Sequence, residues 1–235
     1  MMKIINNCLK FKQSIFAARC VFCEVSLKNS QLSICLPCLQ SLPAASDNDC
    51  PQCGLTSADQ LCGHCLKSPP AFDATHALFR YAYPLDGLLQ KYKYGNALVM
   101  AELFGKLLST SRKNFPLPDL LIPMPLHPQR LQERGFNQAV EIARVTAREL
   151  KLALDIQSCK RIRFSAPQAT LPLKQRVRNM RNAFACERNL TGMKVALVDD
   201  VMTTGASLNA LATAVRKAGA ASIECWVLAR TQPRN

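Results

Sequence analysis

The chain has 235 residues, with 30 Lys and Arg against 16 Asp and Glu, and a formal net charge of +14. This length suits one main domain and a small module, and the charge favours anionic partners such as nucleic acid or phosphorylated compounds. Uncharged runs near the N-terminus are much shorter than the roughly 18 residues of a membrane span, and no signal-peptide core precedes a cleavage site. We therefore expect a cytoplasmic globular protein without a membrane span.

Eight of the twelve cysteines form four Cys-x-x-Cys pairs in the first third of the chain. Two intervening residues let both thiolates of a pair face one metal ion, so the four pairs predict two structural zinc sites. A four-thiolate site has no open position for a substrate, and a reducing cytosol disfavours the alternative of disulfides. The predicted zinc ligands are Cys20, Cys23, Cys35, Cys38, Cys50, Cys53, Cys62 and Cys65.

The sequence leaves open how the four pairs combine. Sequential ribbons would join the first pair to the second and the third to the fourth, whereas nesting would place the outer pairs around the inner ones. His64 lies inside the last pair and is interpreted as a bystander, because every pair is already complete. Cys8, Cys159, Cys186 and Cys225 have no such partners and are interpreted as small apolar residues.

Two consecutive prolines, Pro69 and Pro70, mark a boundary between a zinc-ribbon module, residues 1–68, and a second domain, residues 69–235. In the second domain, apolar runs typical of strands alternate with apolar residues at helical spacing. This alternation indicates an α/β fold, in which helices flank a parallel sheet. Strands are predicted over 75–83, 119–126 and 193–198. Helical spacing is predicted over 85–109, with an interruption around Gly95, and over 137–150 and 207–219.

The stretch VALVDDVMTTGASL, residues 195–208, joins a buried strand to a helix. Ligands of open α/β sheets lie beyond the carboxyl ends of the strands, where Asp199 and Asp200 are expected. The hydroxyl-rich loop that follows enters a helix N-terminus, whose free N–H groups and positive dipole end suit a phosphate monoester. The predicted phosphate-binding residues are Thr203, Thr204, Gly205, Ala206 and Ser207.

The two carboxylates would repel a phosphate, so we expect them to accept hydrogen bonds from the hydroxyls of a sugar. Together with the loop they indicate a ribose 5-phosphate ligand. A P-loop fits worse, because no Lys follows Gly205, and no G-x-G-x-x-G is present. The alternative is that Asp199 and Asp200 only cap the helix.

The apolar strand, the two aspartates and TTGAS resemble the phosphoribosyl pyrophosphate motif of type I phosphoribosyltransferases. The Cys pairs, YKYGN (92–96), PLHPQRLQERGFNQA (125–139) and the terminal CWVLART resemble the ComF/GntX family of competence and DNA-utilisation proteins, over nearly the whole sequence. The resemblance implies a double zinc ribbon followed by a phosphoribosyltransferase-like domain. It also implies a role in handling DNA taken up from outside the cell, with DNA-uptake or recombination proteins as partners.

By position, the resemblance implies that Asp199 and Asp200 bind the ribose hydroxyls of phosphoribosyl pyrophosphate and that residues 203–207 bind its 5-phosphate. The turn after LLIPMPLH is placed like the pyrophosphate loop of these enzymes, where cations and Mg²⁺ would neutralise the leaving pyrophosphate. The predicted residues of this loop are His127, Arg130 and Arg134. The alternatives are a structural role for the histidine and surface charges at a helix start for the arginines.

Residues 156–186 contain no Asp or Glu, so ion pairs within this stretch cannot neutralise its positive charge. The stretch predicts a surface for the backbone of single-stranded DNA, with Tyr92, Tyr94 or Phe164 stacking on bases. By resemblance, it also lies where the family's flexible catalytic loop would close over pyrophosphate. The predicted cations are Lys160, Arg161, Arg163, Lys174, Arg176, Arg178 and Arg181.

Two functions of different classes therefore remain. In the first, the protein handles single-stranded DNA, and its phosphoribosyl pyrophosphate site serves a ligand or regulatory role. In the second, it is an active phosphoribosyltransferase that acts on an unidentified base or amine. The sequence contains no residue pattern that identifies the acceptor or a catalytic residue.

Overall fold

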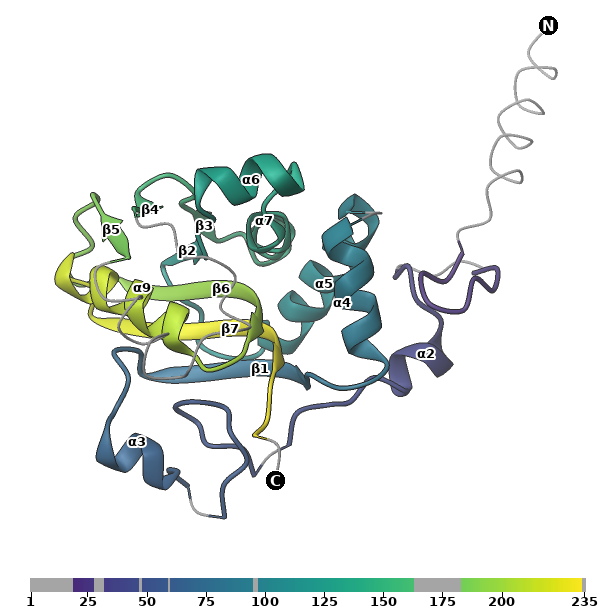
Figure 1. Ribbon diagram of the computed structural model, residues 1–235, viewed down its shortest axis with the longest axis horizontal. Coiled ribbons are helices and arrows are strands. Elements are labelled where there is room, and N and C mark those ends of the chain that lie inside the picture. Colours follow the sequence, from purple (N-terminus) through teal and green to yellow (C-terminus); the bar gives the residue numbers. More distant parts are fainter. Residues whose placement is uncertain are drawn as a thin grey trace, which may run out of the picture. The chain divides into compact units, whose positions relative to one another are not determined.

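The computed structural model describes residues 19–27, 32–46, 48–58, 60–94, 97–162 and 183–233. The chain divides into two compact units, Met1–Leu42 and Pro43–Asn235. The smaller unit holds the first two Cys pairs and helix α2, Leu36–Gln40, whereas the larger unit holds the other two pairs and the central sheet (Figure 1). The predicted division into residues 1–68 and 69–235 separates fold types rather than compact units, and it stays a prediction.

Five parallel strands form the central sheet of the larger unit, in the order β1-β7-β6-β2-β3 (Figure 1). Their bounds are β1 Ala74–Arg80, β2 Leu120–Pro123, β3 Ala153–Leu154, β6 Lys194–Met202 and β7 Ser222–Arg230. In β6, residues 195–198 are at most 1% exposed, because helices cover both faces of the sheet. The α/β fold with a helix-flanked parallel sheet is therefore confirmed.

The helices divide between the two faces of the sheet. Along the sheet, the chain crosses from β6 to β7 in one direction, and from β1 to β2 and from β2 to β3 in the other. Because such connections are right-handed, the helix between β6 and β7 lies on the opposite face of the sheet from the helices of the other two connections. The bounds are α4 Leu85–Tyr94, α5 Ala97–Arg112 and α7 Gln138–Leu150 for the first face, and α9 Ala206–Lys217 for the second. None of the helices in the described ranges is long and apolar enough to cross a membrane.

Close packing explains why the helices sit where they do. A Cβ atom at Gly105 in α5 would lie 2.4 Å from Cβ of Val145 in α7, so the glycine permits the close approach of these two helices. On the other face, Leu208, Leu211 and other residues of α9 pack on the apolar side chains of β6 and β7. The described part of the unit also contains four short elements, α3 Gly63–Lys67, α6 Pro128–Arg134 and an antiparallel pair made of β4 Cys159–Arg161 and β5 Phe184–Cys186.

The predicted elements agree with the structure except at their ends. Asn137 is the N-cap of α7 and accepts hydrogen bonds from two N–H groups of its first turn. Gly219, with a φ of 102°, follows the end of α9, as expected for a helix stop. The strand predicted over 193–198 extends to Met202, because β7, which the sequence did not predict, pairs with β6 along its whole length. Asp199 and Asp200 therefore lie within β6, not beyond it.

Candidate functional site

Asp199 and Asp200 are the polar end of a strand that is otherwise buried. The N–H of Asp200 donates to Oδ1 of Asp199 at 2.9 Å, and the N–H of Val201 donates to Oδ1 of Asp200 at 2.7 Å. The N-cap of α9 is Gly205, which has no side chain to cap it, so the helix-cap alternative for the aspartates is wrong. Burial raises the pKa of Asp199 well above its ordinary value, and the charge of Asp200 raises it further. A proton, a cation or a hydroxyl donor would stabilise such a pair.

Lys93, in α4, supplies a cation to this pair of carboxylates. Its Nζ atom lies 3.6 Å from Oδ2 of Asp200. This lysine is part of the YKYGN motif, but the sequence did not predict it as a site residue. Its neighbour Tyr92 is fully buried and donates its hydroxyl to the carbonyl oxygen of Gln138 at 2.9 Å. Tyr92 therefore belongs to the core, and the expectation that it stacks on a base is wrong.

The loop between β6 and α9 turns at a glycine and leads directly into the first turn of the helix. Gly205 has a φ of 76°, in the left-handed region that favours glycine, and a Cβ there would lie 2.8 Å from Cε of Met202. Thr203 and Thr204 are exposed, and Oγ1 of Thr204 accepts from the N–H of Ala206 at 3.3 Å. The first turn of the twelve-residue helix α9 begins at this loop, and the N–H groups of such a turn have no partner within the helix.

The turn after β2 lies at the same edge of the sheet as the aspartates. The N–H of Met124 donates to the carbonyl oxygen of Val198 at 2.8 Å, immediately before Asp199 in the chain. The side-chain amide of Asn137 donates to the carbonyl oxygen of Met124 at 3.0 Å and so fixes the return of the chain into α7. The predicted pyrophosphate turn and the predicted ribose carboxylates are thus neighbours.

The three residues predicted for this turn have different local roles. His127 is the N-cap of α6, and its Nδ1 atom accepts from the N–H of Gln129 at 3.4 Å, which favours a structural role. Arg134 donates to the side-chain oxygen of Gln138 at 3.3 Å. The positive charge of Arg130 contributes to lowering the pKa of Arg161.

Arg161, in β4, is a further cation whose pKa depends on its surroundings. Burial lowers the pKa of Arg161, the charge of Arg130 lowers it further, and the charge of Asp199 raises it. The guanidinium of Arg161 also lies 5.7 Å from the ring centroid of Phe184 in the facing strand β5. The sequence predicted Arg161 as a DNA contact, and this role stays a prediction.

Lys160 differs from its neighbour Arg161. Its Nζ atom donates to both carboxylate oxygens of Glu187, at 2.9 and 2.8 Å, so an acid just beyond the stretch 156–186 neutralises it. The predicted role of Lys160 as a DNA contact stays a prediction. Successive side chains of a strand point to opposite faces, which explains the difference between the two cations. The side chains of the remaining predicted residues lie outside the part of the chain that the structure describes. These residues are Tyr94, Arg163, Phe164, Lys174, Arg176, Arg178 and Arg181.

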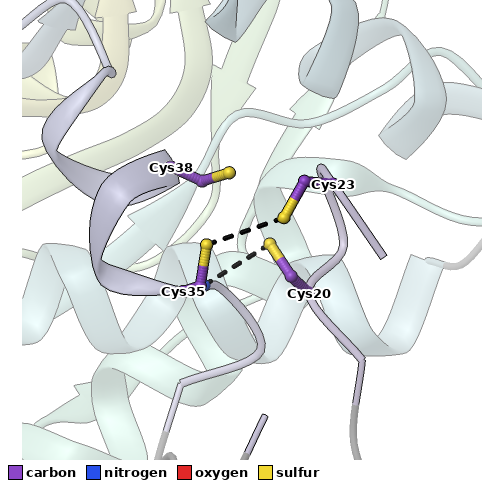
Figure 2. A group of neighbouring side chains, drawn as sticks. All are labelled: Cys20, Cys23, Cys35 and Cys38. Atoms are coloured by element: carbon purple, nitrogen blue, oxygen red, sulfur yellow. Dashed lines mark hydrogen bonds between the residues drawn. The ribbon is translucent and has the colours of Figure 1, made fainter. Parts of the chain in front are cut away.

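The first cluster, Cys20, Cys23, Cys35 and Cys38, brings four sulfur atoms to one point in the smaller unit (Figure 2). The Sγ atoms of Cys23 and Cys35 are 3.7 Å apart, and all four lie within 4.8 Å of one another. Four sulfur ligands around a tetrahedral zinc ion, at about 2.3 Å from it, are about 3.8 Å from one another. The arrangement fits zinc.

The second cluster, Cys50, Cys53, Cys62 and Cys65, repeats this geometry in the larger unit. The Sγ atoms of Cys53 and Cys62 are 3.5 Å apart, and the N–H of Cys62 lies 3.5 Å from Sγ of Cys50. Burial would raise the pKa of Cys50, but the N–H groups of Cys62, Cys53 and the intervening Gln52 lower it to about 7, which favours the thiolate that zinc requires. The sequential pairing is confirmed, nesting is wrong, and each cluster could hold one zinc ion.

The comparisons with known proteins find a domain match in the C-terminal part of the chain and relatives over most of its length. The family model described as phosphoribosyl transferase domain matches residues 137–234. The chain is similar to DNA utilization protein YhgH of Salmonella typhi, with 33% identity over 220 residues, which cover 90% of this chain and 96% of that protein. It is also similar to competence protein F of Haemophilus influenzae, with 32% identity over 228 residues, 92% of this chain and 99% of that protein. A solved purine phosphoribosyltransferase from Pyrococcus horikoshii matches at 22% identity and a TM-score of 0.34, over 55% of this chain and 72% of that one.

Proposed function

Because the chain belongs to the ComF/GntX family of competence and DNA-utilisation proteins, we propose that it handles single-stranded DNA inside the cell and carries a site for phosphoribosyl pyrophosphate or a related sugar phosphate. The observation that carries the sugar-phosphate part is one edge of the sheet, where Asp199 and Asp200 precede a glycine-containing loop that enters α9. Carboxylates suit the hydroxyls of ribose, and the start of the helix suits its 5-phosphate.

The charges around the aspartates support a pyrophosphate next to the ribose. Lys93 pairs with Asp200, and the electrostatic effects on Arg161 link it to both Arg130 and Asp199. A ligand that carries a pyrophosphate would bring several negative charges to these cations, and Mg²⁺ bound to it would offset the repulsion from the carboxylates. The residues proposed to hold this ligand and its Mg²⁺ are Asp199, Asp200, Arg130 and Arg161.

The DNA part of the proposal is supported by the net charge of +14 and by the names of the relatives, a DNA utilization protein and a competence protein. Backbone phosphates bind such cations without regard to sequence, as a protein that handles any incoming strand requires. A cytoplasmic location, and DNA-uptake or recombination proteins as partners, belong to the same proposal.

The sugar-phosphate site is tested by thermal unfolding with phosphoribosyl pyrophosphate and Mg²⁺. A ligand that binds only the folded state raises the melting temperature, so the parent should show a rise and the double variant Asp199→Ala/Asp200→Ala should not. Arg161→Ala should reduce the rise, whereas Lys160→Ala is the matched control, because Glu187 already neutralises that neighbouring cation. An unchanged rise in the double aspartate variant would overturn the proposed site.

The DNA part is tested by the binding of a labelled single strand across a salt series. The affinity of the parent should fall with salt, with a log–log slope of about −0.7 for each phosphate neutralised. A variant with Lys174, Arg176, Arg178 and Arg181 all changed to Ala should flatten this slope for strands of any sequence. The Asp199→Ala/Asp200→Ala variant serves as the control and should retain the parent slope. An unchanged isotherm in the fourfold variant would exclude this segment as the DNA contact.

The alternative function, an active phosphoribosyltransferase with an unidentified base or amine acceptor, is favoured by the match to the phosphoribosyl transferase model over residues 137–234. Consumption of phosphoribosyl pyrophosphate in a screen of bases and amines, with the Asp199→Ala/Asp200→Ala variant as the blank, tests it. Consumption by the parent alone would establish the enzyme. No consumption in a screen where the ligand still raises the melting temperature would favour a binding role.

A further inference from the structure

Arg230, the last residue of β7, is a buried cation that joins two distant parts of the chain. This residue is only 3% exposed. Nε donates to the carbonyl oxygen of Cys53, a member of the second cluster, at 2.7 Å. Nη1 donates to the carbonyl oxygen of Met202 at 3.0 Å and to that of Thr203. One rigid guanidinium thus contacts both the second cluster and the first residue of the proposed phosphate loop.

Burial lowers the pKa of Arg230, and the nearby cysteines Cys53, Cys65 and Cys62 act in the opposite direction. A buried cation is stable only where an opposite charge or several hydrogen bonds compensate its burial. A zinc ion held by four thiolates would carry a net charge of −2, so metal in the second cluster would place a compensating negative charge beside Arg230.

The backbone of the second cluster also approaches this arginine closely. A Cβ at Gly54 would lie 3.4 Å from Cγ of Arg230, so the turn of the cluster packs directly against the arginine stem. Cys53, Cys65 and Arg230 border one cavity of about 1290 Å³ together with residues 203–206 of the loop. The cluster and the loop are therefore neighbours in space, and Arg230 is the side chain that bonds to both.

We propose that Arg230 couples the second cluster to the loop at residues 203–207, so that metal in this cluster raises the affinity of the loop for a sugar 5-phosphate. The inference rests on the proposed sugar-phosphate site. Arg230 acts as a positioning residue, because the two carbonyl groups that it holds set the direction in which the chain enters the loop. Linkage is reciprocal, so a phosphate ligand in the loop must strengthen the retention of metal by the second cluster. The first cluster, in the other compact unit, has no part in this coupling.

The reciprocal effect is measured on the zinc-loaded full chain with a chromogenic chelator, in the presence and absence of ribose 5-phosphate. Zinc should leave in two phases, one for each cluster, and the ligand should slow only the phase that Cys62→Ser abolishes. Coupling between sites is typically about 5-fold or more, so a slowing of about 5-fold is expected. A ligand that binds the parent and slows neither phase, or both phases equally, overturns the inference and leaves the proposed site intact.

The role of Arg230 itself is tested by Arg230→Lys, which keeps the charge and loses the planar set of donors. This variant should bind ribose 5-phosphate about 5-fold more weakly and should lose the ligand effect on zinc release. The matched control is Arg216→Lys, because Arg216 also donates to main-chain carbonyls, those of Ala71, Ala220 and Ala221, at the other end of α9. The control should behave like the parent.

Each outcome decides one of the two proposals. An Arg230→Lys variant that keeps both the parent affinity and the ligand effect overturns the inference. If this variant does not fold, the ligand effect on the two phases of the parent decides by itself. If the parent shows no binding of ribose 5-phosphate by calorimetry, the proposed sugar-phosphate site is overturned, and the coupling falls with it.

Discussion

The two four-cysteine clusters use the same local turn in different surroundings. In the first cluster, the N–H of Cys20 donates to the carbonyl oxygen of Val25 at 2.9 Å, and in the second, the N–H of Cys50 donates to that of Leu55 at 2.7 Å. The residue after each first pair has a positive φ, 61° for Glu24 and 69° for Gly54. The first cluster belongs to a small compact unit, whereas the second belongs to the unit of the parallel sheet.

The second cluster is bonded to the sheet of its own unit. Thr75, in β1, donates its N–H to the carbonyl oxygen of Pro51 at 2.8 Å and its hydroxyl to that of Gln52 at 2.7 Å. Near the C-terminus, Gln232 donates to the carbonyl oxygen of Gly54 at 3.1 Å. The same metal-binding turn therefore organises a small unit in one part of the chain and supports a larger fold in another.

Loss of one metal site should separate the two roles most strongly. Cys20→Ser and Cys50→Ser should each lower the zinc content from about two ions to about one. Only Cys50→Ser should lower the melting temperature of the sheet, by roughly 10 °C. Loss of this metal site should lower the free energy of unfolding by a few kcal/mol, and each kcal/mol shifts the melting temperature of a domain of this size by about 2–4 °C. Elemental analysis measures the zinc, and fluorescence of Trp226, the single tryptophan, buried in β7, reports the unfolding of the sheet.

Equal melting shifts in the two cysteine variants would contradict the division between a small independent turn and a supporting one. A variant with unchanged zinc content would show instead that its cysteine is not a ligand.

Acid should destabilise the sheet unit through Asp155, in addition to the loss of zinc that follows when the thiolates are protonated. Burial would raise the pKa of Asp155, but the N–H groups of Ser158 and Gln157 and the guanidinium of Arg188 lower it to about 2. A lowered pKa contributes stability that is present above the ordinary value of 3.8 and is lost as the pH falls towards 2. Asp155→Asn should therefore cost about 2 kcal/mol at neutral pH and flatten the loss between pH 4 and 2.

Chemical denaturation of the parent and of Asp155→Asn, followed by Trp226 fluorescence, measures this difference. The variant should retain the zinc content of the parent. The same slope of stability against pH in both proteins would exclude Asp155 as the source.

Exchange of the residues with positive φ should have opposite effects in the two clusters. Glu24→Gly should stabilise the first turn by up to about 1 kcal/mol, because glycine adopts this conformation without strain. Gly54→Ala should destabilise the second by about 1–2 kcal/mol, because the new Cβ is strained and would lie 3.3 Å from Cγ2 of Thr75. The rate of zinc release to a chelator should fall in the first variant and rise in the second. Changes of the same sign would contradict the equivalence of the two turns.

The smallest effect is expected from the contact between the second cluster and the C-terminal segment. Gln232 accepts from the N–H of Thr56 at 3.0 Å and donates to the carbonyl oxygen of Gly54. Gln232→Ala should lower the free energy of unfolding of the sheet unit by about 1 kcal/mol, since neither hydrogen bond is fully buried. Gln90→Ala, on an exposed position of α4, is the control and should change it by less than about 0.5 kcal/mol. Equal effects would show that this contact does not support the turn.

Much of the fold was predictable because it depends on local patterns. The helix at 137–150 carries its own N-cap, Asn137, and the end of α9 carries Gly219, so short stretches specify where these helices begin and end. The continuous apolar run predicts β6, but Asp199 and Asp200 interrupt this run, and pairing with β7 keeps them and the two residues after them in the strand. The predicted end of this strand was wrong for that reason.

The site residues that sequence reasoning missed are cations without a distinctive local pattern. Lys93 reaches Asp200 because α4 packs beside the end of β6. Arg161 was grouped with Lys160 as one basic stretch, although a strand sends neighbouring side chains to opposite faces, and this alternation was the available signal. The sequence around Lys93 contains no comparable signal.

The sequence by itself determined the residue types of the metal sites, the parallel α/β class and the loop at 203–207, because each depends on spacing over a few residues. The tertiary structure decided that the second cluster belongs with the sheet, that Lys93 pairs with Asp200, and that Arg230 bonds to both Cys53 and Thr203. These contacts join residues that are distant in the chain. No local preference encodes them, since they form only when the packing of buried strands and helices fixes which ends of the elements meet.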